Sequence, residues 1–223
     1  MYAAHECRVH FYTTPRESML RKGEEGYSER NNMESLKKKI REEGSVIGTE
    51  IVKVDSFLNH QIDVAFFDEI GAEFRKRFDG VRISKILTVE ASGIGIACAA
   101  ARYFGFPPVV FAKKSAPSTM TDGFFDAIAK SFTKGTVSNL KVDRKYLKEG
   151  DKVLILDDFL ATGEASIALA NLAEQAGAEV AGIGAVIEKG YQGGAQRLRE
   201  KGYKVESLAV ISRITDGRVY FEE

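Results

Sequence analysis

The sequence predicts an α/β fold in which a mainly parallel central sheet is flanked by helices. Hydrophobic segments of strand length alternate with helical segments, and strands are expected to begin at Ile86, Val109, Val153 and Val180. The strand at 153–156 holds four consecutive apolar residues, which is typical of a strand buried on both faces. The 223 residues are enough for one domain, and no repeat, low-complexity tract or Pro/Ser-rich linker divides them.

The composition is that of an ordinary soluble protein, with 44% hydrophobic and 29% charged residues. Acidic and basic residues balance at 32 each, so the chain has no general attraction to nucleic acid or to an anionic membrane. Cys7 and Cys98 form no disulfide framework, which suits a reducing cytoplasm. No apolar run approaches the length of a membrane span, and no signal-peptide core is present. We therefore expect a cytoplasmic protein.

Residues 1–32 differ from the rest because they are polar, mixed in charge and without clear periodicity. We expect them to be a poorly ordered N-terminal extension, or the product of a start codon assigned too early, ahead of a domain spanning 33–223. His5, Cys7 and His10 lie close together, but neither a fourth ligand nor a matching cluster accompanies them. We therefore expect no metal site in this segment.

The first part of the domain contains two helices and a strand. Residues 33–43 have amphipathic helical spacing, with Leu36 and Ile40 on the apolar face. A short strand follows at 51–54. Residues 63–78 again have helical spacing. The stripe that this second helix is expected to bury in the core consists of Phe66, Phe67, Ile70 and Phe74.

A strand at 83–89 leads into a tight loop at 90–95, and a helix of small residues is expected at 96–104. Gly93 in this loop permits a close approach of the backbone to another group. The Ser-Gly-x-Gly pattern is by itself a weak signal, so the loop alone assigns no ligand.

The strand at 109–112 ends in Lys113 and Lys114. From charge patterning alone this pair is either a solvated surface pair or a binding site for a polyanion. The polar stretch that follows, as far as Thr136, is expected to be a long loop, and loops of this length in compact domains are often lids.

Asp157 and Asp158 come directly after the strand at 153–156, where that strand is expected to end. The turn 161–163 follows, and 164–175 has helical spacing. Such a turn places free amides and the positive end of a helix dipole around an anion, with the acids at the ligand edge of a parallel sheet. An Asp here is equally compatible with a helix cap or a turn. Neither a Walker loop nor a dinucleotide fingerprint is present.

The last third of the domain supplies the remaining strands. The strand at 180–187 is interrupted by two glycines and ends close to Lys189, which is either a surface end-cap or a ligand contact. An exposed helix is expected at 193–201 and a strand at 205–211. Residues 213–223 are expected to form an edge hairpin or a tail.

Together, these residues resemble a known family. The hydrophobic strand, Asp157-Asp158, two apolar residues and Ala161-Thr162-Gly163-Glu164-Ala165 resemble the motif by which type I phosphoribosyltransferases bind PRPP, 5-phosphoribosyl 1-diphosphate. The stretch 55–63 closely resembles the base-binding hood of the xanthine phosphoribosyltransferases within that family. The resemblance runs from Met33 to the C-terminus. It implies the type I fold, with a small hood built from about 33–62 and C-terminal elements.

The resemblance also implies an activity, namely transfer of the 5-phosphoribosyl group from PRPP to N9 of xanthine in purine salvage, with XMP and pyrophosphate as products. Asp157 and Asp158 would hold the ribose hydroxyls and favour positive charge on the sugar. The residues implied to bind the 5-phosphate are Ala161, Thr162, Gly163, Glu164 and Ala165. Those implied to bind pyrophosphate are Ala91, Ser92, Gly93, Lys113 and Lys114. Those implied to bind xanthine are Val52, Asn59, Phe159 and Lys189.

The family resemblance further implies a cofactor and a partner. Mg²⁺ is expected to bind mainly through PRPP and pyrophosphate oxygens, and no protein ligand is assigned to it. The loop ending at Thr136 resembles the family's mobile loop, whose closure would exclude water from PRPP. A homodimer is expected, and in relatives the basic segment can reach the neighbouring subunit, so Lys113 or Lys114 would then act across the dimer.

Three alternatives to xanthine as the base remain within the family, namely hypoxanthine, guanine and adenine. Lysine has three donors and no acceptor, so Lys189 suits a purine oxo group and disfavours the exocyclic amine of adenine. A different class of protein on this fold is a PRPP-responsive transcription regulator with a winged-helix module. Residues 1–32 are too short and too neutral for such a module, and we expect no nucleic-acid partner.

Overall fold

The computed structural model describes residues 33–115, 123–131 and 136–222. Contacts divide the chain into residues 1–31 and residues 32–223, and everything described below lies in the second part. The prediction of a poorly ordered extension at 1–32, with its three potential metal ligands, falls outside the described residues.

A central sheet confirms the predicted α/β class. Among the described residues its strand order is β10-β9-β8-β7-β3-β4, and every neighbouring pair is parallel except β9 and β10, which form an antiparallel hairpin at one edge. The strands span Lys85–Val89 (β3), Val109–Ala112 (β4), Lys152–Leu160 (β7), Glu179–Lys189 (β8), Val205–Thr215 (β9) and Arg218–Phe221 (β10).

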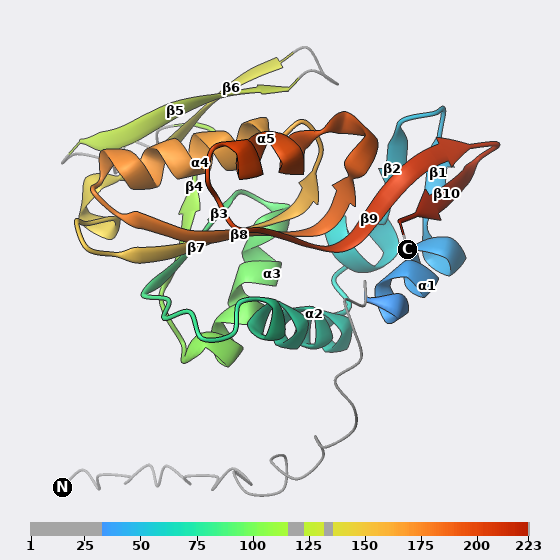
Figure 1. The fold of residues 1–223 in the computed structure, drawn as a ribbon, viewed down its shortest axis with the longest axis horizontal. Helices are drawn as coiled ribbons and strands as arrows, with labels where there is room; N and C mark the ends of the chain where they lie inside the picture. Colours follow the sequence, from blue (N-terminus) through green and yellow to red (C-terminus); the bar gives the residue numbers. More distant parts are fainter. Residues whose placement is uncertain (1–32, 116–122, 132–135, 223) are drawn as a thin grey trace, which may run out of the picture. The chain divides into compact units, whose positions relative to one another are not determined.

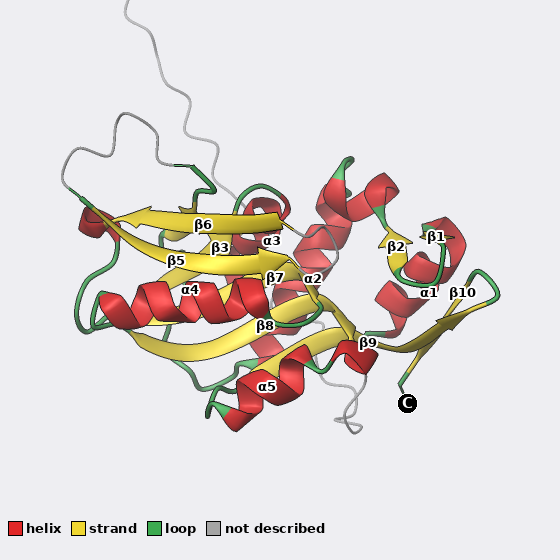
Figure 2. Cartoon of the chain, turned by 90° about the horizontal axis from the view of Figure 1, so that it is seen from above, coloured by secondary structure: helices red, strands yellow, loops and turns green. Residues whose placement is uncertain are grey.

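Helices cover both faces of this sheet, as Figures 1 and 2 show. The helices α2 and α3 lie on one face, and α4 and α5 lie on the other. Each face has its own cluster of buried apolar side chains. The helices span Val64–Arg77 (α2), Ser92–Ala101 (α3), Glu164–Gln175 (α4) and Gly194–Glu200 (α5). Short 3₁₀ turns lie at Arg102–Phe104, Arg144–Tyr146 and Gly190–Gln192.

The glycines that interrupt β8 make room for two phenylalanine rings, one on α2 and one at its C-cap. A Cβ on Gly182 would lie 2.4 Å from the Phe78 ring, and a Cβ on Gly184 would lie 2.7 Å from the Phe74 ring. Both rings are fully buried. The glycines therefore continue the strand and leave space for these two rings, because a larger residue would collide with them.

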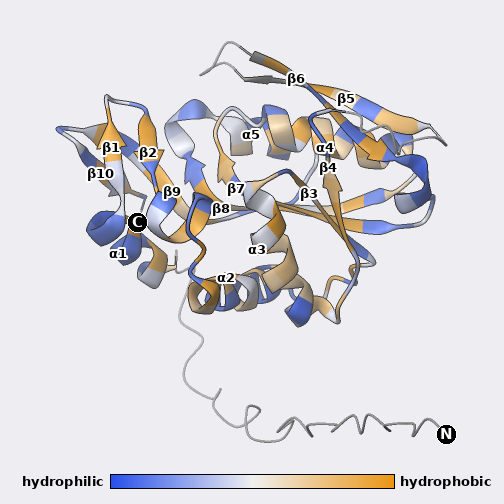
Figure 3. Cartoon of the chain, turned by 180° about the vertical axis from the view of Figure 1, so that it is seen from behind, coloured by the Kyte–Doolittle hydropathy of each residue, from blue (hydrophilic) through white to orange (hydrophobic). Residues whose placement is uncertain are grey.

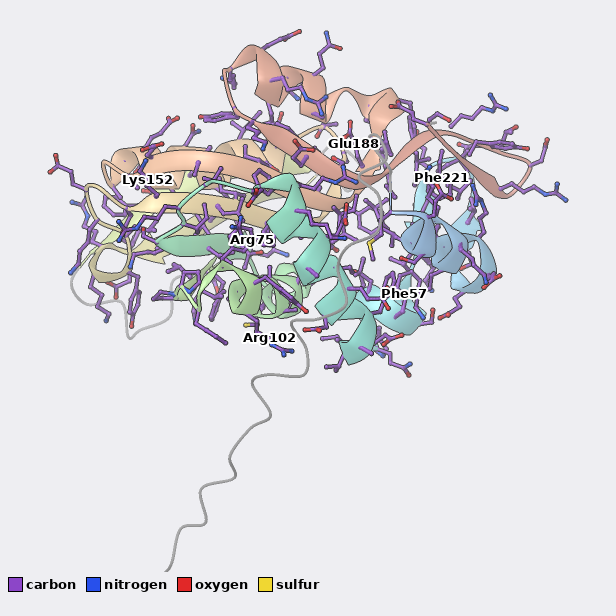
Figure 4. All side chains as sticks on the ribbon, turned by 60° about the horizontal axis from the view of Figure 1, so that its bottom comes forward. Phe57, Arg75, Arg102, Lys152, Glu188 and Phe221 are labelled. Carbon is purple, nitrogen blue, oxygen red and sulfur yellow. The ribbon has the colours of Figure 1, made fainter. Side chains whose placement is uncertain are left out.

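The N-terminal segments form the predicted hood at the β9–β10 end of the sheet (Figure 1). They comprise α1 (Glu34–Glu43), the hairpin of β1 (Ser45–Ile47) with β2 (Ile51–Lys53), and a π-helical turn at Asp55–Asn59. In Figure 3 α1 is largely hydrophilic, whereas the edge strand β4 is hydrophobic. Phe221 of β10 lies against α1 (Figure 4), with the Arg41 guanidinium 5.0 Å from its ring centroid. The strand β1 was not predicted.

One predicted loop is in part a hairpin. Residues 124–131 form β5 (Phe124–Ser131), which pairs antiparallel with β6 (Thr136–Asp143) and packs on α4 (Figure 2). The expectation of a continuous loop as far as Thr136 is therefore wrong over these residues. Their side chains alternate, because Ala127 and Ala129 are buried while Ile128 is exposed. This period of two is the mark of a half-buried strand. Residues 116–122 lie outside the described residues.

Two element boundaries also differ from the prediction. Helix α3 begins at Ser92 instead of residue 96, so the loop after β3 is only Glu90 and Ala91. Strand β7 continues through the acidic pair to Leu160, because β8 is long enough to pair with it up to Glu188. Within the described part of the chain, no helix is long and apolar enough to cross a membrane.

Candidate active site

The sheet changes direction of winding between β3 and β7. After β3 the chain passes through α3 to β4 on one side, and β7 later joins β3 on the other side. As a result α3 and α4 start on opposite faces of the sheet (Figure 1). The pairing of β3 with β7 stops at Ile155, before β7 itself ends. A crevice outside the carboxyl ends of such diverging strands is where open α/β sheets bind ligands.

The acidic pair lies on β7 just beyond the last residue that pairs with β3. Asp157 is only 5% exposed, while Asp158 is half-buried and donates its backbone N–H to Asp157 Oδ1 at 3.0 Å. Burial raises the pKa of the Asp157 carboxyl well above its usual range, and the Asp158 carboxylate adds to this shift. The positive charge of Lys114 acts in the opposite direction. Asp157 therefore sits where a positive charge would be strongly favoured.

The start of α3 approaches this acid closely. A Cβ on Gly93 would lie 1.9 Å from Thr88 Oγ1 and 3.4 Å from Asp157 Oδ1, so only glycine fits there. The Thr88 hydroxyl is fully buried and has no hydrogen-bond partner among the described residues. The first amides of α3, including those of Ser92 and Gly93, have no carbonyl partner within the helix. The start of α3 therefore offers N–H groups to an anion, and it lies next to Asp157.

The two lysines after β4 are placed differently. Lys114 donates its backbone N–H to Glu90 Oε1 at 2.7 Å, which ties it to the loop after β3. Its charge reaches Asp157, as the opposing effect on the Asp157 pKa shows. Lys113 instead exchanges backbone hydrogen bonds with Lys141, and its ammonium lies 5.6 Å from the Phe111 ring centroid. Of the two, Lys114 is the one whose charge acts on Asp157.

The small-residue loop after β7 is held from outside by α5. Gly163 adopts a left-handed conformation with φ +86° and forms the N-cap of α4. The carbonyl of Ala161 accepts from the Gly194 N–H at 3.1 Å, and the carbonyl of Thr162 accepts from Arg197 Nη1 at 2.8 Å. With those carbonyls engaged on the outside, the first-turn amides of α4 remain available to an anion.

The structure also brings together two of the four residues implied to bind the base. Lys189, at the end of β8, is 9% exposed and lies 5.9 Å from the Phe159 ring centroid. Its Nζ donates to the backbone carbonyl of Glu50, in the turn of the hood hairpin, at 2.7 Å. Burial lowers the pKa of this lysine. Val52 is 7% exposed and belongs to the hydrophobic core, and Asn59 is exposed at the end of the π-helical turn.

Sequence reasoning missed four contributors to this region. The hydroxyl of Thr88 had a signal, since it is a polar residue in an otherwise apolar strand. The contacts of Glu50, Gly194 and Arg197 had none, because each is made to a residue distant in the sequence. No group of three or more His, Cys, Asp or Glu side chains in the described residues is arranged to hold a metal ion.

Comparison with known proteins supplies the family. Residues 53–217 match the family described as the phosphoribosyl transferase domain. The xanthine phosphoribosyltransferase of Ruminiclostridium cellulolyticum is 52% identical over 191 residues, which cover 86% of this chain and all of that protein. The xanthine phosphoribosyltransferase 2 of Clostridium botulinum strain Langeland is 50% identical over 190 residues, 85% of this chain and all of that protein.

Solved structures with a similar fold have more distant sequences. The adenine phosphoribosyltransferase of Thermoanaerobacter pseudethanolicus superposes with a TM-score of 0.64 at 23% identity, covering 80% of this chain and 98% of that chain. The adenine phosphoribosyltransferase of Trypanosoma brucei gives a TM-score of 0.67 at 16% identity, covering 81% of each. These likenesses concern the fold. The family match and the close relatives together show that this chain belongs to the phosphoribosyltransferase family.

Proposed function

We propose that this chain is a xanthine phosphoribosyltransferase, which transfers the 5-phosphoribosyl group of PRPP to N9 of xanthine. The bond between C1 of the ribose and pyrophosphate breaks, a bond from C1 to N9 forms, and the N9 proton is released. The observation that carries the proposal is that Lys189 of β8 lies 5.9 Å from the ring centroid of Phe159, which directly follows the acidic pair on the neighbouring strand β7. Relatives of about 50% sequence identity that are named xanthine phosphoribosyltransferases support xanthine as the base.

The acidic pair stabilises the positive charge that develops on the ribose during the transfer. As the bond to pyrophosphate lengthens, C1 and the ring oxygen acquire positive charge. Asp157 and Asp158 hold the ribose hydroxyls, and their negative charge stabilises this cation-like state. Asp157 is the stronger contributor, because its carboxyl is buried and a charge there acts through less intervening water than one on the more exposed Asp158. No nucleophilic side chain is needed for this transfer.

Two amide-rich turns hold the phosphates. The loop of Ala161, Thr162 and Gly163 with the first turn of α4 binds the 5-phosphate through backbone N–H groups. Ala91, Ser92 and Gly93 at the start of α3 bind pyrophosphate, with Lys114 adding positive charge and Lys113 a weaker candidate. The two turns approach the crevice from opposite faces of the sheet, which suits the two ends of one PRPP molecule.

The base lies on the Phe159 side. The ring of Phe159 packs on the purine plane, and the Lys189 ammonium donates to a purine oxo group. One of its three protons is used by the Glu50 carbonyl, which leaves two for the base. Asn59 of the hood hydrogen-bonds to another edge of the purine through its side-chain amide. Val52 is buried in the hydrophobic core beneath the hood. An adenine amine would face an ammonium that offers it no acceptor.

Magnesium fits this arrangement as a partner of PRPP. Carboxylate oxygens of Asp157 and Asp158 are hard ligands of the kind Mg²⁺ prefers, but they are too few for an all-protein site. When bound, Mg²⁺ neutralises the charge of the departing pyrophosphate. We also propose that the enzyme works as a homodimer in the cytoplasm, and sedimentation of the purified chain tests the first of these statements.

A panel of bases tests the activity. The purified protein is incubated with PRPP, Mg²⁺ and each of xanthine, hypoxanthine, guanine and adenine, and nucleotide products are separated by chromatography. We expect XMP to form with the highest kcat/KM and AMP with the lowest. Preferential formation of AMP would reject the role of Lys189 in base selection. Absence of any nucleotide, with all four bases, would reject the transferase assignment for this chain.

A further inference from the structure

The short helix α5 abuts the loop that we propose binds the 5-phosphate. A Cβ on Gly194 would lie 2.2 Å from the Ala161 carbonyl oxygen and 2.7 Å from the Gly163 nitrogen, so the two backbones are in direct contact. The Gly194 N–H donates to the Ala161 carbonyl at 3.1 Å. One end of the loop is therefore seated against α5, and this inference builds on the proposed function of that loop.

Arg197, one turn further along α5, reaches the same loop with both ends of its guanidinium. Its Nη1 donates to the Thr162 carbonyl at 2.8 Å, and its Nη2 donates to Glu164 Oε1 at 2.9 Å. The Glu164 side chain is 20% exposed and that of Arg197 is 47% exposed. A guanidinium is a rigid fork, so two simultaneous bonds fix the relative position of both acceptors.

The two bonds have separate electrostatic effects on a phosphate. A carbonyl dipole turned toward the phosphate would repel it, and Arg197 keeps the Thr162 carbonyl turned to the outside. The Glu164 carboxylate, in the first turn of α4, would also repel a phosphate at the same helix end. Its ion pair with Arg197, at 2.9 Å, places a positive charge directly beside that carboxylate.

We propose that Arg197 is a positioning residue for the 5-phosphate site, which orients the Thr162 peptide and neutralises Glu164. The arginine does not itself contact the reacting atoms. An ordinary exposed ion pair contributes little to stability, so a purely structural Arg197 would leave substrate affinity unchanged. The proposal instead requires a selective loss of PRPP affinity when the guanidinium is removed.

Arg197→Ala tests this requirement through steady-state kinetics with PRPP and xanthine. Loss of the two bonds is expected to raise the KM for PRPP roughly fivefold to tenfold, while kcat and the KM for xanthine change little. Arg197→Lys keeps the positive charge but loses the planar guanidinium that makes both hydrogen bonds, so we expect a KM for PRPP between those of the wild type and Arg197→Ala. Gln196→Ala is the matched control, because Gln196 lies on the same helix and its side chain donates at 2.9 Å to the exposed Glu200, away from the loop.

Glu164→Gln separates the two effects. In the Arg197→Ala background this change removes the uncompensated carboxylate, and we expect it to recover part of the lost PRPP affinity. In the wild-type background it is expected to change the KM for PRPP much less. An Arg197→Ala enzyme with a wild-type KM for PRPP would overturn the positioning role. A double variant no better than Arg197→Ala alone would overturn the neutralising role.

A binding measurement keeps this inference separate from the choice of base. Titration calorimetry with PRPP and Mg²⁺ measures affinity without turnover. If wild-type protein binds PRPP but converts a base other than xanthine, the proposed substrate fails and Arg197→Ala still tests the inference. If PRPP binds wild-type protein and Arg197→Ala equally well, the inference fails whatever the base. Thermal unfolding of each variant confirms that the comparison is made between folded proteins.

Discussion

Gly194→Ala would disturb the loop 161–163, which we propose binds the 5-phosphate, through direct contact with its backbone. The added methyl group would lie 2.2 Å from the Ala161 carbonyl oxygen, 2.7 Å from the Gly163 nitrogen and 2.9 Å from the Thr162 carbonyl carbon. All three are backbone atoms, so no side chain can rotate away to make room. The collision must be relieved by moving either the loop or α5.

The size of that movement follows from the contact distances. Ordinary van der Waals contact begins at 3.4 Å, so the Ala161 carbonyl and the new methyl group must separate by about 1.2 Å. The hydrogen bond from the Gly194 N–H to this carbonyl is lost in the process. A misplacement of about 1 Å in a group that positions substrate can cost about 100-fold in rate. We expect a loss of that order in kcat/KM for PRPP.

The assay is steady-state kinetics with PRPP varied at saturating xanthine, together with thermal unfolding. Gly193→Ala is the control, because a Cβ there meets nothing within 4 Å although the residue has φ +72°. It is expected to lose about 1 kcal/mol of stability, roughly 2–4 °C in Tm, and to retain its KM for PRPP. A folded Gly194→Ala enzyme with wild-type kcat/KM would refute the claim that α5 fixes the loop.

Two further predictions concern the charged groups of the crevice. Asp157→Asn should abolish most of kcat and yet raise stability near pH 7 by about 1 kcal/mol, a Tm increase of roughly 2–4 °C. Because the pKa of Asp157 is raised in the folded protein, ionisation of this carboxyl lowers the free energy of unfolding. This destabilisation is absent below the ordinary carboxyl pKa of about 4 and grows as the pH rises toward the pKa of Asp157 in the folded protein. Unfolding scans should therefore show the two proteins converging near pH 4, and a variant less stable than wild type at pH 7 would contradict the reasoning. Lys189→Ala should raise the KM for xanthine far more than the KM for PRPP. Burial lowers the pKa of Lys189, so the wild-type KM for xanthine should rise at a lower alkaline pH than it would with an exposed lysine. This rise should be missing in the variant. If Lys189→Ala raised the KM for xanthine and the KM for PRPP equally, a role of Lys189 in binding the base would be excluded.

The elements that were predicted well are those with strong local patterns. The apolar run of β7 and the phenylalanine stripe of α2 identify a buried strand and an amphipathic helix without reference to the rest of the chain. The hairpin of β5 and β6 was missed because the surface of α4 on which it packs begins at Glu164, well beyond the end of β6 at Asp143. Its weak alternation has meaning only once α4 is known to cover it.

The candidate site divides in the same way. Asp157, Asp158 and the loop to Ala165 belong to one contiguous motif, so their proximity follows from the chain itself. The roles assigned to these residues remain predictions. Arg197 reaches the Thr162 carbonyl across 35 residues, and Lys189 reaches the Glu50 carbonyl across 139. Such contacts leave no local signature, because an arginine on an amphipathic helix and a lysine at a strand end are common surface residues.

The packing of α2 against β8 connects the two segments that carry Asn59 and Lys189, which we propose bind the base. Asn59 lies a few residues before α2, whose cap Asp63 accepts from the Phe66 N–H at 3.1 Å. Lys189 ends the strand into which Phe74 and Phe78 fit at Gly184 and Gly182. Helix α2 thus packs against the strand that carries Lys189 and follows the turn that carries Asn59. We expect a bulkier residue at Gly184, which would collide with the Phe74 ring, to shift α2 relative to β8 and thereby to change the relative affinity of the enzyme for the four purine bases.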